Sequence, residues 1–567
     1  MNRGAFLLIR PLMLALFFVG YLTFPTQSIA TTETATPTIS TTEGPIQGRD
    51  LNGLRVFKGI PYALAPVGPL RWRPPKAPVK RRKLLIADRF ALSCPQVTTL
   101  GVYAGPTSVA EDCLYLNIFA PAGAGTTSPR PVIVWLHGGG HLAGTASDYD
   151  GGKLALGGPL GSQTVVVTIN YRLGVLGFLA HPALASEDRL AGNYGLLDVL
   201  RALQWVRANI ASFGGDPNNV TLGGQSAGAS LTSAAMISPM AAGLFHRAIL
   251  QSGPLSVLPS MATALQRGSA MAHTAGCDGN DERTAACLRA LPVPQLLQLQ
   301  GRLNESGPFF VGPMIDGTII NRSPMDAWTA GAFNRVPVLG GTVQDEGQFA
   351  MVVSAYTSGD ADLTPAQYEE RVRRRYVGPA GPGGTGPAYP ADAAAKVLAA
   401  YPIANYADAG LAFGATQTDP IVCRANRALV AMAQWVPAYG YEFQYRDAPF
   451  YFPPQGQIRP LAAHTIDLQF LFPGWHGGML GINHRPQGSW AAGEIEGPEI
   501  VLSDRLIALW TKFSDRGDPG EAGGITWPAF KSSQSLLAQN VPDMSLIDEA
   551  AFRDNHHCEL WDELLVY

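Results

Sequence analysis

Short runs of apolar and β-branched residues recur along most of the chain and predict buried strands. They cover 44–48, 54–59, 114–120, 132–137, 164–171, 219–223, 247–251, 336–340 and 440–446. The run 164–171 is almost entirely apolar, as expected of a strand covered on both faces of a sheet. Helices are predicted at 196–211, 227–236 and 502–513. This alternation predicts an α/β fold with one mostly parallel central sheet.

The N-terminal residues differ in kind from the rest of the chain. Arg3 and Arg10 give a positive start, an apolar stretch covers 12–22, and Ser-Ile-Ala closes the segment at 28–30. This pattern predicts a secretory signal at 1–30 that is cleaved after Ala30, with an uncleaved anchor as the alternative. The apolar stretch is short for a membrane span, and no later run is long enough for one.

Composition and charge restrict the choice of partners. The 567 residues are 46% hydrophobic and 15% charged, with a net charge of −3. Such a chain can bury a large core, and we find no internal repeat or linker, so residues 31–567 are predicted to form a single domain. The small net charge and the lack of a Lys/Arg-rich run with interleaved aromatics argue against a nucleic acid or an anionic membrane as partner.

Six cysteines are consistent with an exported protein that carries disulfides. They are Cys94, Cys113, Cys277, Cys287, Cys423 and Cys558. Several pairings are possible. Cys94 with Cys113 and Cys277 with Cys287 would close short loops, and the last two would tie the C-terminal tail to the body. No Cys-x-x-Cys and no His/Cys cluster occurs, so neither a zinc site nor a thiol redox site is indicated.

The pentapeptide Gly-Gln-Ser-Ala-Gly at 224–228 lies between the predicted strand 219–223 and the predicted helix 227–236. In this context the pattern is typical of a nucleophile elbow, a sharp strand-to-helix turn that presents Ser226. The helix N-terminus would favour an oxyanion there. The alternative is a glycine-rich turn with no chemical role.

A serine nucleophile needs a base, an acid that orients the base, and donors for the oxyanion. In sheets of this type the acid and then the histidine follow the serine along the chain. Glu346 follows the strand 336–340, and His464 follows the strand 440–446. From position alone other residues compete, namely Asp345 and Asp316 for the acid, and His476 and His484 for the base.

Three consecutive glycines follow the predicted strand 132–136, at 138–140. A glycine loop here allows close approach of the backbone to a substrate. The N–H groups of Gly139, Gly140 and Ala227 are therefore the candidate oxyanion donors, although the glycines could also form a simple loop.

Several motifs, in order along nearly the whole mature chain, resemble those of the type-B carboxylesterases, the carboxylesterase/cholinesterase family. They are Phe-Lys-Gly-Ile-Pro-Tyr-Ala at 57–63, Glu-Asp-Cys-Leu-Tyr-Leu-Asn at 111–117, Gly-Asn-Tyr-Gly-Leu-Leu-Asp at 192–198, Phe-Gly-Gly-Asp-Pro at 213–217, the elbow at 224–228, Phe-His-Arg-Ala at 245–248, Gln-Ser-Gly at 251–253, Asp-Glu-Gly at 345–347, and His464 before Asp467. The resemblance implies the α/β-hydrolase fold, with a large twisted, mostly parallel sheet flanked by helices and small antiparallel strands near the N-terminus.

The resemblance also implies roles for particular residues. It assigns the triad to Ser226, Glu346 and His464, and the oxyanion hole to Gly139, Gly140 and Ala227. It supports the three cysteine pairs given above, and it implies a structural ion pair between Arg71 and Glu111.

The chain departs from the family pattern at three places. The residue before the nucleophile is Gln225, where the family often has Glu, and no Trp lies between Cys94 and Cys113. Cholinesterases bind a quaternary ammonium with a Trp in that loop, so these two changes argue against choline esters. His141 stands where Phe commonly follows the glycines. A solvated loop position is expected for it, and the alternative is that it lines the pocket.

Together these features predict a secreted or periplasmic carboxylic-ester hydrolase that acts through an acyl-enzyme. The expected partner is a small-molecule ester, uncharged because no charged cluster marks the site, and no metal or organic cofactor is implied. Activity should rise with pH as His464 loses its proton, around its ordinary pKa of about 6.5. A lipase, or a detoxifying esterase for a bulky natural product, is the alternative. The intact triad argues against a non-catalytic adhesion protein.

Overall fold

The structure is a computed structural model that describes residues 34–97, 107–188, 190–253, 257–305, 311–359, 362–378, 388–452, 458–477 and 494–565. The predicted signal segment at 1–30 lies outside these residues. In the part of the chain that is described, no helix combines the length and the apolar character needed to cross a bilayer.

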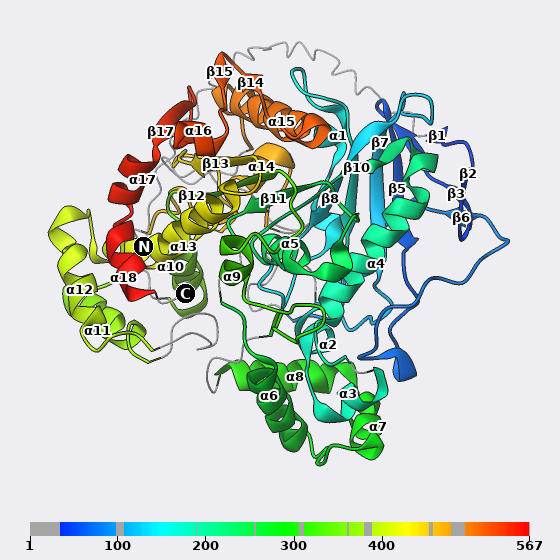
Figure 1. Ribbon diagram of the computed structural model, residues 1–567, viewed down its shortest axis with the longest axis horizontal. Helices are drawn as coiled ribbons and strands as arrows, with labels where there is room; N and C mark the ends of the chain where they lie inside the picture. Colours follow the sequence, from blue (N-terminus) through cyan, green and yellow to red (C-terminus); the bar gives the residue numbers. More distant parts are fainter. Residues whose placement is uncertain are drawn as a thin grey trace, which may run out of the picture.

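A 12-stranded sheet runs through the described residues (Figure 1). In spatial order its strands are β1 (Thr34–Ala35), β4 (Arg49–Leu51), β5 (Leu54–Pro61), β7 (Tyr115–Pro121), β9 (Val165–Ile169), β8 (Arg130–Leu136), β10 (Gly215–Gln225), β11 (Arg247–Gln251), β12 (Val338–Val343), β13 (Ala438–Phe443), β16 (Ser535–Gln539) and β17 (Ser545–Asp548). Neighbouring strands are parallel from β9 to β16 and antiparallel at both edges. The predicted fold class is confirmed.

Two small sheets accompany the large one. One joins β2 (Ile39–Thr41), β3 (Gly44–Gln47) and β6 (Leu85–Ile86), and the other pairs β14 (Glu521–Ala522) with β15 (Ile525–Thr526). The antiparallel pairing of β2 with β3 lies near the N-terminus, as the resemblance implied.

Alternate residues of each central strand point to opposite faces of the sheet, because side chains alternate along a strand. Val132 and Val134 of β8 pack in one buried cluster with residues of α4 (Tyr194–Asn209) and α5 (Ala227–Ile237). Ile133 and Trp135 pack in a second cluster with residues of α15 (Pro498–Arg516). Both faces are therefore covered, which explains the continuous apolar runs in the sequence.

The structure describes fifteen further α-helices. They are α1 (Gly152–Leu156), α2 (Gly174–Phe178), α3 (Pro182–Asp188), α6 (Met261–Thr274), α7 (Glu282–Ala290), α8 (Val293–Glu305), α9 (Pro324–Thr329), α10 (Gln348–Ser358), α11 (Pro365–Arg375), α12 (Ala393–Ala400), α13 (Ala409–Ala433), α14 (Leu468–Leu471), α16 (Phe530–Ser533), α17 (Glu549–Asn555) and α18 (Cys558–Leu564). Figure 1 shows α3, α6, α7 and α8 gathered at one end of the molecule, and α11 and α12 beside α18.

Three disulfides join Cys94 to Cys113, Cys277 to Cys287, and Cys423 to Cys558, the pairs that the resemblance supported. The third attaches the start of α18 to the middle of α13. The implied ion pair is also present: the Arg71 guanidinium donates to both oxygens of Glu111 at 2.6 Å. Its remaining N–H groups donate to backbone carbonyl oxygens of Arg289 and Leu291. These links join loops and helices that lie outside the sheet.

Candidate active site

Four segments that are distant in sequence meet at the carboxyl edge of the sheet. The glycine loop follows β8, Ser226 follows β10, Glu346 follows β12, and His464 lies in the long segment after β13. This edge is where open α/β sheets bind their ligands.

Ser226 occupies a sharp turn between β10 and α5, with φ 57° and ψ −122°. A Cβ on Gly228 would lie only 2.0 Å from the carbonyl oxygen of Leu136, and one on Gly224 would lie 2.6 Å from the backbone of Gly228. Both glycines are therefore required by the close approach of β8 to the turn. Ser226 N donates to the carbonyl oxygen of Gln251 at 2.9 Å, which holds the turn against β11.

His464 and Glu346 are in direct contact. Nδ1 of His464 lies 2.5 Å from Oε2 of Glu346, whose side chain is fully buried. Burial by itself would lower the pKa of His464, but the Glu346 carboxylate outweighs it and raises that pKa above its ordinary value of 6.5. The structure therefore moves the expected deprotonation of His464 to a higher pH than the sequence suggested.

Ser226 and His464 line one cavity of about 480 Å³. Within the described residues, however, the hydroxyl of Ser226 makes no hydrogen bond, and Nε2 of His464 lies 3.2 Å from Nε2 of Gln225. Nucleophile and base are thus brought to the same cavity without being hydrogen-bonded to each other. Such bonds often tighten only when a substrate is bound.

The glycine loop has a conformation that L side chains rarely adopt. Gly139 has φ 107° and Gly140 has φ 63°, and a Cβ on Gly139 would lie 2.1 Å from the carbonyl oxygen of Ala143. Among the described residues, neither N–H donates a hydrogen bond. Ala227 is the first residue of α5, so its N–H has no acceptor within the helix. These three donors line or border the cavity that contains Ser226.

The expectation of a solvated His141 is wrong. Its side chain is buried, with 4% relative exposure, and its ring contacts Phe178 edge-on at 5.5 Å. Its carbonyl oxygen accepts a hydrogen bond from Gly174 N at 2.6 Å, which turns the residue inward. Burial lowers the pKa of His141 to about 4, so it is neutral at neutral pH.

The cavity wall is largely apolar and aromatic. Its side chains include Val97, Leu142, Tyr149, Phe349, Tyr451 and Trp475. Asp148 is the one acidic residue among the described lining residues, and none of them is Lys or Arg. Sequence reasoning did not find Phe349, Tyr451 or Trp475, because single aromatics in loops carry no periodic signal.

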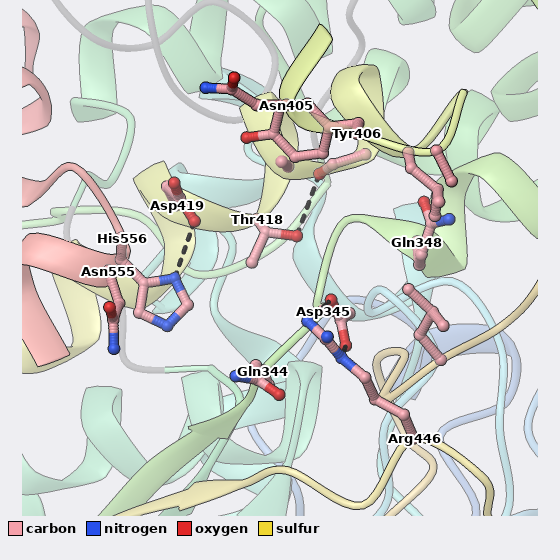
Figure 2. A pocket seen from close by; sticks show the side chains of 15 residues that line it. Gln344, Asp345, Gln348, Asn405, Tyr406, Thr418, Asp419, Arg446, Asn555 and His556 are labelled. Atoms are coloured by element: carbon pink, nitrogen blue, oxygen red, sulfur yellow. Dashed lines mark hydrogen bonds and ion pairs between the residues drawn. The ribbon is translucent and has the colours of Figure 1, made fainter. Parts of the chain in front are cut away.

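The three competing candidates that the structure describes are engaged in other contacts. Nε and Nη2 of Arg446 donate to the two carboxylate oxygens of Asp345, at 2.7 and 2.8 Å. Asp345 and Arg446 line a separate cavity of about 300 Å³ (Figure 2). Asp316 accepts three backbone N–H groups of its own turn. His476 pairs with Glu494 at 2.7 Å. His484 lies outside the described residues.

A further buried carboxylate, to which sequence reasoning assigned no role, lies three residues beyond His464. Asp467 accepts a hydrogen bond from Nε2 of Gln251 at 2.9 Å, and Oε1 of Gln251 accepts one from Nε1 of Trp510 at 3.1 Å. Burial raises the pKa of Asp467 to about 6. Its position in His-x-x-Asp is the only sequence signal that could have pointed to it.

Comparison with known proteins identifies the relatives of the chain. The model of the carboxylesterase family matches residues 35–561. The chain is 34% identical to the fumonisin B1 esterase of Sphingopyxis macrogoltabida, over 88% of this chain and 85% of that protein. It is 32% identical to the para-nitrobenzyl esterase of Bacillus subtilis (strain 168), over 87% and 92%. A solved PNB esterase structure matches with a TM-score of 0.73 and 28% identity, over 94% of this chain and 99% of that one.

Proposed function

The chain belongs to the carboxylesterase family and is a carboxylic-ester hydrolase, and from this premise we propose that Ser226, His464 and Glu346 form its catalytic triad. The observation that carries the proposal is the 2.5 Å contact between Nδ1 of His464 and Glu346, beside the cavity that Ser226 and the glycine loop share.

In the proposed reaction, Nε2 of His464 takes the proton of the Ser226 hydroxyl as Oγ attacks the ester carbonyl. The N–H groups of Gly139, Gly140 and Ala227 hold the oxyanion that develops. The alcohol then leaves with the proton from His464, and water hydrolyses the acyl-enzyme by the same route. Glu346 stays ionised and stabilises the imidazolium.

The proposed substrates are uncharged esters. A carboxylate on the substrate would meet Asp148, and the described lining residues include no Lys or Arg to compensate its desolvation. An apolar acyl or alcohol group would instead contact aromatic walls such as Phe349 and Trp475.

The triad is tested by comparing Ser226→Ala with Ser230→Ala. Ser230 lies on the same helix, and its hydroxyl donates to the carbonyl oxygen of Gly253 at 3.0 Å. We expect Ser226→Ala to lose at least about 10³-fold in kcat for p-nitrophenyl butyrate, and Ser230→Ala to keep wild-type activity within a few-fold. A fluorophosphonate probe should label Ser226 in the wild-type chain. If Ser226→Ala retained activity, Ser226 would not be the nucleophile and the proposed triad would be wrong.

A second candidate, an esterase for one bulky natural ester, is favoured by the relative named fumonisin B1 esterase. The ester panel should therefore contain fumonisin B1 beside p-nitrophenyl esters of increasing acyl length. Preference for short uncharged acyl groups supports the proposal above, and preference for long acyl chains supports a lipase.

We also propose that residues 1–30 are a secretory signal and that residues 31–567 fold as one domain. Three disulfides support export, because such bonds persist in oxidising compartments. The intact mass of protein exported by a bacterial host should correspond to a chain that begins at Thr31. A mass that retains 1–30 would contradict cleavage.

A further inference from the structure

The amide of Gln225, the residue before the proposed nucleophile, lies between the catalytic base and the glycine loop. Its Nε2 is 3.2 Å from Nε2 of His464, and a Cβ on Gly138 would lie 2.9 Å from its Oε1. The side chain is 1% exposed. Gln225 is thus packed between His464 and Gly138, at the wall of the cavity that contains Ser226.

The two contacts of the His464 ring specify the same tautomer. A glutamine Nε2 can only donate, so it requires an unprotonated Nε2 on the imidazole. An ionised carboxylate can only accept, so Glu346 requires the proton on Nδ1. The imidazole with its proton on Nδ1 satisfies both, and it is the form in which Nε2 can accept a proton from Ser226.

We propose that Gln225 is a positioning residue whose side-chain amide donates to Nε2 of His464 and holds the resting imidazole neutral, with its proton on Nδ1. The proposal rests on the triad assignment above. When the hydroxyl of Ser226 donates to Nε2 of His464, the amide of Gln225 gives up its own hydrogen bond to that nitrogen. Nε2 of His464 therefore accepts first from Gln225 and then from Ser226.

Other groups that face His464 act in different directions. The carboxylate of Glu346, in the loop after β12, favours the protonated ring of His464. So does the carboxylate of Asp467, which lies three residues after His464 in the chain. The phenol of Tyr441 on β13 donates to Asp467, and that of Tyr451 contacts Thr465. The donor from Gln225 favours the neutral ring, because an imidazolium would turn an N–H toward the amide N–H. Gln225 therefore offsets part of the effect of the two carboxylates.

The test is the acid limb of the pH profile of kcat/KM, which reports the pKa of the free base. Gln225→Met removes the donor at similar volume, and the limb should move up by about half to one pH unit, since a hydrogen bond contributes on the order of 1 kcal/mol. Gln225→Glu places an acceptor and a negative charge there, and its limb should move up by about one unit or more.

Gln300→Met is the matched control. Gln300 is also buried, and its Oε1 accepts from Val175 N at 2.8 Å, far along the chain from His464. The acid limb of the pH profile of Gln300→Met should stay at the wild-type position. A limb that is unchanged or lowered in Gln225→Met overturns the proposal, and Gln225→Glu is judged by the same rule if the first variant fails to fold.

A second measurement does not depend on folding of the Gln225 variants. In wild-type protein labelled with ¹⁵N-histidine, the His464 signal above its pKa should show a protonated Nδ1 and an unprotonated Nε2, with His464→Gln identifying the signal. A protonated Nε2 would overturn the role of Gln225. The triad proposal fails separately, if Ser226→Ala retains activity whatever the position of the limb.

Discussion

Replacing His556 tests how strongly a buried cation holds the C-terminal tail to the sheet. His556 follows α17, and its Nδ1 lies 2.8 Å from Asp419 in α13 while its Nε2 lies 2.6 Å from Glu442 on β13. All three side chains are at least nine-tenths buried. Figure 2 shows His556 directed at Asp419 beside the cavity that also contains Asp345.

The contribution of His556 to the free energy of unfolding follows from the shift of its pKa on folding. Burial opposes the charge on His556, but hydrogen bonds to the two carboxylates outweigh it and raise its pKa to about 10, from 6.5. At about 1.36 kcal/mol per unit this corresponds to a contribution of about 5 kcal/mol below pH 6.5, of which about 4 kcal/mol remains at pH 7. Because the folded-state pKa is the higher one, the contribution is lost as the pH rises from about 6.5 to about 10.

His556→Gln should therefore lower the free energy of unfolding by about 4 kcal/mol at pH 7, since Glu442 loses its cation and Asp419 retains its contacts with His557 and Tyr401. In a chain of this length that is a fall in Tm of about 4 °C. Differential scanning calorimetry at several pH values should show the gap to wild type closing as the pH approaches 10.

His273→Gln is the matched control for this experiment. His273 forms an ion pair with Asp278 at 2.7 Å, but both side chains are exposed, at 81% and 68%. Exposed pairs contribute little, so this variant should melt with the wild type at every pH. The reasoning is refuted if His556→Gln melts within a degree of wild type at pH 7, or if the gap is constant up to pH 10.

Three further predictions concern the framework and the glycine loop. Arg71→Met leaves the partly buried Glu111 carboxylate without its cation and should lower the free energy of unfolding in urea by about 3 kcal/mol. Gly139→Ala places a Cβ against the carbonyl oxygen of Ala143, so kcat should fall by about 10²-fold or more while calorimetry shows a folded protein. Cys558→Ser opens a disulfide that spans 135 residues, and about 4–5 kcal/mol of stability should be lost in thermal melts.

Local pattern predicted the central strands well. The run 247–251 coincides with β11, and 219–223 and 227–236 lie within β10 and α5 around the elbow. These segments are covered on both faces or packed on one side, so burial leaves a strong periodic or continuous apolar signal. The predicted strand 336–340 begins two residues too early, because pairing with β11 and β13 rather than composition sets where β12 starts.

Other elements left no such signal. The 25-residue helix α13 contains Pro420 and two glycines, which individually oppose a helix, and it was not predicted. Packing overrides that preference: Gly414 lies against the side chain of Gln348, and Cys423 is bonded to the tail. His141 was assigned to solvent because a polar residue after glycines is usually exposed, but the turn of the loop directs it inward.

The sequence by itself determined the candidate chemistry, since a serine between glycines, at a strand-to-helix turn, is specified by residues that are neighbours in the chain. Position along the chain could not choose between Glu346 and Asp345, or among the histidines, because acid and base are 118 residues apart and no local pattern links them. Only the resemblance to a known family implied Glu346 and His464. The tertiary structure directs the carboxylate of Glu346 to His464 and that of Asp345 to Arg446, which supports the proposed triad. It also placed the Gln225 amide on His464, a contact between residues separated by 239 positions.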